Sequence, residues 1–202
     1  DVIAGQGTVG LEIAARMSPD VVIVPIGGGG LASGVALALK SQGVRIVGAQ
    51  VEGVDAMARA LQGGSGRIDA APTLADGVRV HEAGLLTRRL LAGLLDDIVI
   101  VREAELRETL VRLALEEHVI AEGAGALALA AGKRVAARRK CAVVSGGNLD
   151  AGVLATLLTE VRPRPPRKPR RRRRERLPSP AAQPIALPAG LLPNPSPAPD
   201  PR

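Results

Sequence analysis

The sequence predicts an α/β fold: a mostly parallel sheet with a layer of helices on each face. Two observations predict it. Short apolar runs rich in β-branched residues alternate with helix-compatible segments, and strands separated by helices of about 10–15 residues form βαβ units. The chain has no Phe, Tyr or Trp, so its core must be built from Leu, Val, Ile and Ala.

The first predicted elements are a helix, a strand and a second helix. Residues 7–17 form the opening helix, with no strand before it. Residues 21–26 read VVIVPI, a continuous apolar run typical of a strand buried on both faces. Four glycines end this run, and the Ala- and Leu-rich residues 31–42 form the next helix. Because the sheet begins on a helix, we expect the domain to be incomplete and to lack an upstream part.

Three more strands are predicted from apolar runs at residues 45–50, 98–101 and 141–145. In residues 103–117, apolar side chains recur at helical spacing, and Gly, Ser and Pro mark residues 63–73 as a loop. The other predicted helices that complete the alternation are 53–61, 84–95, 124–137 and 151–160.

From Arg162 onward the alternation of strands and helices ends. Thirteen of the 16 prolines lie beyond this residue, together with the basic run Arg170–Arg174. Proline removes backbone donors and like charges repel, so residues 161–202 are predicted to be a disordered tail after a domain at 1–160. The tail carries a net charge of +9 and the domain one of −2. The domain therefore does not favour a nucleic-acid partner, and a solvated tail or an out-of-frame extension is favoured over a nucleic-acid-binding arm.

The composition also predicts a compartment. A single cysteine, Cys141, excludes an internal disulfide, no apolar run approaches the ~20 residues of a membrane span, and no signal peptide opens the chain. We expect a cytoplasmic protein without a membrane partner.

The glycines Gly27–Gly30 lie between a strand and a helix, where main-chain N–H groups can bind a phosphate. Spacing alone also allows a dinucleotide site, since Gly27, Gly29 and Ala32 match G-x-G-x-x-A and Glu52 ends the next strand. A second glycine-rich turn at residues 145–148 favours a compact phosphorylated ring, with its phosphate at one turn and its ring at the other. An NAD-binding module remains the alternative.

Five motifs in order resemble one known family: the fold type II, tryptophan-synthase-β-like enzymes that use pyridoxal 5'-phosphate (PLP), in their threonine/serine dehydratase and serine racemase branch. The motifs lie at residues 2–12, 25–31, 73–77, 122–126 and 145–148. The resemblance covers roughly residues 2–158 and implies a three-layer α/β fold. It implies a lyase that eliminates water from L-threonine or L-serine to give a 2-oxo acid and ammonia.

The resemblance also implies roles for single residues. The PLP phosphate would be bound by Gly27, Gly28, Gly29, Gly30 and the amide of Leu31. Ser145 would contact the pyridine nitrogen. Without the resemblance, a turn or helix N-cap role would explain a serine there equally well, and the resemblance favours the ring contact. Glu122 would lie near the ring face, and Asp76 and Gly77 beside the substrate.

Some members of this branch bind a divalent cation after the strand that matches residues 45–50. By resemblance, Glu52 and the Ala56 carbonyl would bind Mg²⁺, but the expected second acid falls at Ala58 and Asp55 is out of place. Oxygen-rich sites need several ligands, so the metal prediction is weaker than the cofactor prediction.

The chain departs from the family in one decisive respect. PLP enzymes act through a lysine amine, which this family carries in its amino-terminal half, and Lys40, Lys133, Lys140 and Lys168 match no such position. We therefore assign no catalytic residue and expect the chain to be inactive without a missing amino-terminal half. A homodimer is expected by resemblance. The chain could also be a racemase fragment or a non-catalytic remnant.

Overall fold

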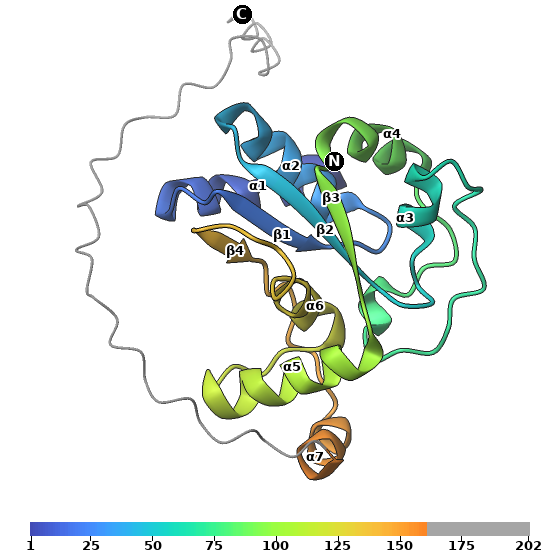
Figure 1. Cartoon of the computed structure of the whole chain (residues 1–202), viewed down its shortest axis with the longest axis vertical. Helices are drawn as coiled ribbons and strands as arrows, with labels where there is room; N and C mark the ends of the chain where they lie inside the picture. The colour runs from blue at the N-terminus through green and yellow to red at the C-terminus, as the bar shows by residue number, and fades with distance from the viewer. Residues whose placement is uncertain (161–202) are drawn as a thin grey trace, which may run out of the picture. The chain divides into compact units, whose positions relative to one another are not determined.

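Four parallel strands form the sheet of the computed structural model (Figure 1), which describes residues 1–160. The strands are β1 (Val21–Pro25), β2 (Arg45–Val51), β3 (Asp97–Val101) and β4 (Lys140–Ala142), in the order β3-β2-β1-β4. The predicted tail lies outside the described residues.

Helices cover both faces of the sheet, as the sequence predicts (Figure 1). One layer holds α1, α2, α3 and α4, and the other holds α5, α6 and α7. Their bounds are α1 Val2–Arg16, α2 Gly30–Leu39, α3 Ala56–Leu61, α4 Leu85–Leu94, α5 Glu103–Glu116, α6 Gly123–Ala131 and α7 Ala151–Glu160, with 3₁₀ turns at Lys40–Gln42 and Asp76–Val78. No helix within residues 1–160 is long and apolar enough to cross a membrane.

Strand β1 supplies side chains to two separate cores, because successive residues of a strand point to opposite faces. Val22 and Val24 pack with residues of α2, α3 and α4. Val21 and Ile23 pack with residues of α5, α6 and α7. All five residues of β1 are buried, which makes this strand the centre of the fold and a rigid support for the turn that follows it.

The structure shifts several of the predicted boundaries, and the helix predicted at 124–137 ends at Ala131. The opening helix begins at Val2 rather than at residue 7, because its first turns pack closely on α2. A side chain at Gly34 of α2 would meet the main chain of Ile3 and Gly7. The predicted helix at 53–61 begins only at Ala56. A tight turn, closed by the hydrogen bond from Val54 N–H to Val51 O, precedes it. The last strand is shorter than predicted and ends at Ala142.

Candidate functional site

The candidate site lies where the order of the strands reverses. The chain runs from β1 outward to β2 and β3, and then returns to add β4 on the other side of β1. Ligands of open parallel sheets bind at the carboxyl ends of the strands at such a switch point. Val21 pairs with Lys140 and Ile23 with Ala142, so the turns that follow β1 and β4 lie beside each other.

A pocket of about 220 Å³ opens between these turns. Glycines and small residues form most of its wall, and Glu122 and Ser145 supply its polar side chains. It is lined by Pro25, Gly27, Gly28, Gly29, Gly30, Leu31, Gly77, Val78, Glu122, Ala124 and Ser145. Every residue predicted to bind the cofactor therefore lines this one pocket, together with Gly77.

Asp76 does not line this pocket. Its carboxylate instead accepts a hydrogen bond from Gly77 N–H, at 2.8 Å. The side chain is exposed, and its predicted place beside the substrate remains a prediction.

The first turn, residues 27–31, presents main-chain N–H groups. Helix α2 has no side-chain N-cap, and its first hydrogen bond runs from Ser33 N–H to Gly29 O, at 2.9 Å. The N–H groups of Gly30, Leu31 and Ala32 therefore have no helical acceptor. Such groups, with the positive end of the helix dipole behind them, favour an anion.

Gln50 fixes the main chain just before the first turn. This residue of β2 is fully buried. Its Nε2 donates to Ile26 O at 3.1 Å, and its Oε1 accepts from Ala58 N–H at 2.8 Å. A buried polar group must be hydrogen-bonded, and Gln50 meets this need by joining the end of β1 to α3.

The second turn, residues 145–148, is held by Glu122. The Glu122 N–H donates to Gly146 O at 3.1 Å, and its carboxylate accepts from Asn148 N–H at 3.1 Å. A side chain at Gly125 would collide with the Gly146 carbonyl. This close approach explains why small residues begin α6, and it places Glu122 between the two turns.

Gly77 and Val78 line the pocket at the end of a loop, residues 73–78, which Glu103 holds in place. Its carboxylate accepts from the Thr73 hydroxyl at 2.7 Å and from Leu74 N–H at 2.9 Å. Arg79 closes the same loop by donating to the Ala70 and Ala71 carbonyls. Gly77 therefore reaches the pocket on a segment that is anchored to α5.

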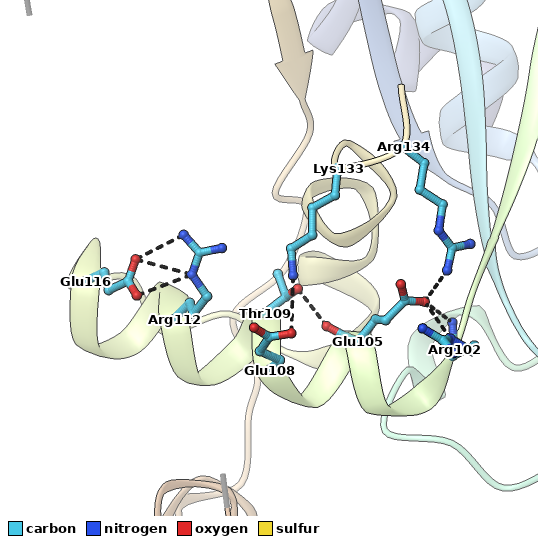
Figure 2. A network of polar contacts seen from close by, with 8 residues as sticks. All are labelled: Arg102, Glu105, Glu108, Thr109, Arg112, Glu116, Lys133 and Arg134. Atoms are coloured by element: carbon cyan, nitrogen blue, oxygen red, sulfur yellow. Dashed lines mark hydrogen bonds and ion pairs between the residues drawn. The ribbon is translucent and has the colours of Figure 1, made fainter. Parts of the chain in front are cut away.

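A network of charges joins the start of α5 to the end of α6 (Figure 2). Glu105 accepts from Arg102 N–H at 3.0 Å and pairs with Arg134, whose guanidinium also donates to Ile100 O at 2.6 Å. Burial opposes ionisation of Glu105, but the hydrogen bonds from Arg102 and Arg134 outweigh it and lower its pKa from 4.5 to about 2. The network fixes α5, which Glu103 begins, and the end of α6, whose N-cap residue is Glu122.

Comparison with known proteins decides the family. The model of the family described as pyridoxal-phosphate dependent enzyme matches residues 1–147. The chain belongs to this family. It is 42% identical to L-threonine ammonia-lyase of Thermotoga maritima, over 79% of this chain and 41% of the relative. It is 46% identical to the catabolic L-threonine dehydratase of Escherichia coli strain K12, over 74% of this chain and 48% of the relative. The chain thus spans less than half the length of these relatives.

Solved structures agree with this assignment. The processed form of threonine deaminase isoform 2 from Solanum lycopersicum is similar with a TM-score of 0.72 and 29% identity, over 78% of this chain and 49% of that one. Maize serine racemase gives a TM-score of 0.70 and 35% identity, over 78% and 53%. The predicted fold class is confirmed. Sheet order alone would not have excluded a dinucleotide site, because the order 3-2-1-4 also occurs in the sheet of that fold.

In this PLP-dependent family member, the lysines of the described chain lie away from the pocket. Lys40 pairs with Asp96 at 2.7 Å, and Lys133 pairs with Glu108 at 3.7 Å. Lys140 donates to the carbonyls of Gly132 and Val135. Lys168 lies outside the described residues.

The residues predicted to bind a metal follow β2. Glu52 is exposed and Ala56 is buried at the start of α3. Asp55 pairs with Arg59 at 3.0 Å. Within residues 1–160 no group of three His, Cys, Asp or Glu side chains is placed to hold a metal ion. Mg²⁺ binding through Glu52 and a carbonyl remains a prediction.

Sequence reasoning missed Gln50 and Glu103. Gln50 is a polar residue inside an apolar strand, which was an available signal for a buried hydrogen bond. Glu103 begins a helix, where an acid is expected for local reasons, so nothing in the sequence pointed to its contact with Thr73.

Proposed function

We propose that the chain is the carboxyl-terminal part of a PLP-dependent hydroxy-amino-acid ammonia-lyase that acts on L-threonine or L-serine. One observation carries the proposal: the glycine turn after β1 and Ser145 after β4 line the same pocket at the switch point of the sheet. The names of the relatives support the substrate class.

The residues present fit this cofactor. Its phosphate needs several N–H donors at close range, which the start of α2 offers. Its pyridine nitrogen needs a small polar partner, and the Ser145 hydroxyl lines the opposite wall. Ser145 is exposed, so it is available to a ligand. The pocket is smaller than the ~300–1,000 Å³ typical of whole ligand sites, which is consistent with this chain building one side of a larger site.

Bound PLP would supply an electron sink for the substrate's α-carbon. Ser145 sets how strong that sink is. A neutral hydroxyl can donate a hydrogen bond to the ring nitrogen without holding a proton on it, as a carboxylate would. We therefore expect Ser145 to favour loss of the β-hydroxyl over a long-lived carbanion. Glu122 would hold the second turn in register with the ring, and Gly77 would leave room for the substrate.

The whole reaction needs a lysine amine at the cofactor, which the described residues 1–160 do not supply. The three described lysines are engaged elsewhere, so we infer that a lysine from an amino-terminal part completes the site. Strand β4 lies at an edge of the sheet, and hollows of about 470 and 300 Å³ flank it. These features support the addition of further structure beside β4. A homodimer and a bound Mg²⁺ remain predictions.

Complementation tests this function. The chain is co-expressed with the segment of Thermotoga maritima L-threonine ammonia-lyase that it does not cover, and 2-oxo acid and ammonia are measured with L-threonine and L-serine. We expect activity only when both parts are present; each part alone is the control. A complex of the two parts that forms no oxo acid would support a non-catalytic remnant instead.

A racemase is the second candidate, because serine racemases are among the similar structures. The same co-expressed preparation distinguishes a racemase from an ammonia-lyase. Formation of D-serine in excess of 2-oxo acid would favour the racemase, and oxo acid in excess of D-serine the ammonia-lyase.

A further inference from the structure

Helix α4 reaches the first glycine turn through the side chain of Thr87. The Thr87 Oγ1 lies 2.5 Å from the carbonyl oxygen of Gly28, which is 59 positions earlier in the chain, and 3.0 Å from that of Gly84. A hydroxyl has one hydrogen to donate. The contact with Gly28 is the shorter of the two, so we assign the Thr87 hydrogen to the Gly28 carbonyl.

The surrounding chain is built for this contact. Gly29 has a φ of +91°, and a side chain there would lie 2.8 Å from the Thr87 Cβ and 3.0 Å from the Met57 Cε. A side chain at Gly84 would lie 2.7 Å from the Thr87 hydroxyl oxygen and 3.1 Å from the Gly28 oxygen. Turn and helix therefore meet with no room for either Cβ.

The contact fixes the direction of an amide. The Gly28 carbonyl and the Gly29 N–H belong to one planar trans peptide, in which the C=O and N–H bonds point in opposite directions. When Thr87 holds the carbonyl towards α4, the Gly29 N–H must point away from α4. If this peptide were flipped, its carbonyl oxygen would face the anion, and the lone pairs of that oxygen would repel the anion.

We propose that Thr87 is a positioning residue for the cofactor phosphate, which it serves by holding the Gly28–Gly29 peptide in the orientation that a phosphate requires. This inference rests on the proposed cofactor site and adds to it a residue that does not line the pocket. Thr87 acts through the turn and touches neither cofactor nor substrate.

Two ligands isolate the phosphate. Pyridoxine 5'-phosphate and pyridoxine differ only in that group, and neither has an aldehyde that could react with surface lysines. Their affinities for the full 202-residue chain are measured by calorimetry, and the ratio of the two affinities reports on the phosphate site. Thr87→Val keeps the shape and removes the hydroxyl, while Thr87→Ser keeps the hydroxyl and serves as the rescue.

In Thr87→Val we expect the preference for the phosphate ester to fall about three- to tenfold, the range of one hydrogen bond, with the affinity for pyridoxine unchanged. Thr87→Ser should keep the wild-type ratio. Amide hydrogen exchange of residues 28–32 should accelerate in Thr87→Val and not in Thr87→Ser.

Three results would overturn the inference, and they can be told apart. An unchanged ratio in Thr87→Val, with wild type preferring the phosphate ester, removes the role of Thr87 and leaves the cofactor site intact. A ratio lost equally in Thr87→Ser shows that the hydroxyl is not responsible, and this holds even if Thr87→Val fails to fold. A wild-type chain with no preference for the phosphate ester overturns the proposed site itself.

Discussion

The two turns of the candidate site differ in how this chain supports them. The first turn, residues 27–31, follows a strand that is buried at every residue and paired on both sides, and Gln50 and Thr87 hold it from two further elements. The second turn, residues 145–148, follows a three-residue strand at the edge of the sheet and is held by Glu122. The chain by itself thus holds the turn proposed for the phosphate more firmly than the turn proposed for the ring. The turn proposed for the ring is where we expect a missing amino-terminal part to contribute.

The largest expected effect tests the support of the first turn. Gly29→Ala places a Cβ against Thr87 and Met57 at a residue with a φ of +91°. We expect a loss of about 2–4 kcal/mol in the free energy of unfolding, from backbone strain together with overpacking. Urea unfolding measures it. Gly28→Ala is the matched control, because a Cβ there meets no atom within 4 Å. Equal losses in both variants would show that the turn is not tightly held.

The second expected effect is a dependence of the free energy of unfolding on pH. The pKa of Glu105 is lowered to about 2, so its stabilising contribution is fully present above about pH 4.5 and is lost as the pH falls towards 2. Because its partner Arg134 follows α6, acid should loosen α6 and the second turn before the first. We expect Glu105→Gln to cost about 1–2 kcal/mol at pH 7 after allowance for solvent screening.

Unfolding curves between pH 7 and pH 2 check this prediction, and stability should depend less on pH in Glu105→Gln than in wild type. Glu116→Gln is the control, since Glu116 pairs with Arg112 on a solvent-facing part of α5 (Figure 2), where ion pairs contribute little. The interpretation fails if both variants have the same pH profile.

The third effect should be confined to the second turn. Glu122→Ala removes the acceptor for Asn148 N–H, and we expect a loss of about 1 kcal/mol, the usual contribution of one hydrogen bond. Hydrogen exchange should accelerate at residues 146–149 and stay unchanged at residues 28–32. If residues 28–32 accelerate as well, the two turns are one cooperative unit and the contrast between them is wrong. Glu117→Ala, at an exposed position five residues earlier in the chain, is the control.

The strands, and the places of the site residues at their ends, could be predicted from the sequence. The four strands were predictable because apolar β-branched runs such as residues 21–26 have one stable place in a fold of this class. The positions of Gly27–Gly30 and Ser145 at strand ends followed from that, and the order β3-β2-β1-β4 then brings them together. Family resemblance, rather than periodicity, assigned their ligand.

What remained hidden were contacts between distant segments. Thr87 reaches Gly28 across 59 positions, and Glu103 reaches Leu74 across 29. Each of these contacts depends on how a helix packs on the sheet, and no local sequence pattern specifies this packing. The Asp76 carboxylate turns to its own neighbour, Gly77, a choice between rotamers that the motif does not reveal.

The smallest effect on stability, and the most specific one, should come from Ser145. Its hydroxyl is exposed at the pocket, so Ser145→Ala should change the free energy of unfolding by less than about 0.5 kcal/mol. The ring of bound pyridoxine 5'-phosphate should respond instead. Since the chain has no Phe, Tyr or Trp, the pyridine absorbance can be followed directly. In Ser145→Asp the carboxylate should hold a proton on the ring nitrogen, so the absorbance of the protonated ring should persist to higher pH than in wild type. In Ser145→Ala the affinity should fall while that pH dependence moves little. Identical spectra in all three proteins would place Ser145 away from the ring and reduce it to a turn residue, and the second turn would then have no part in binding the cofactor.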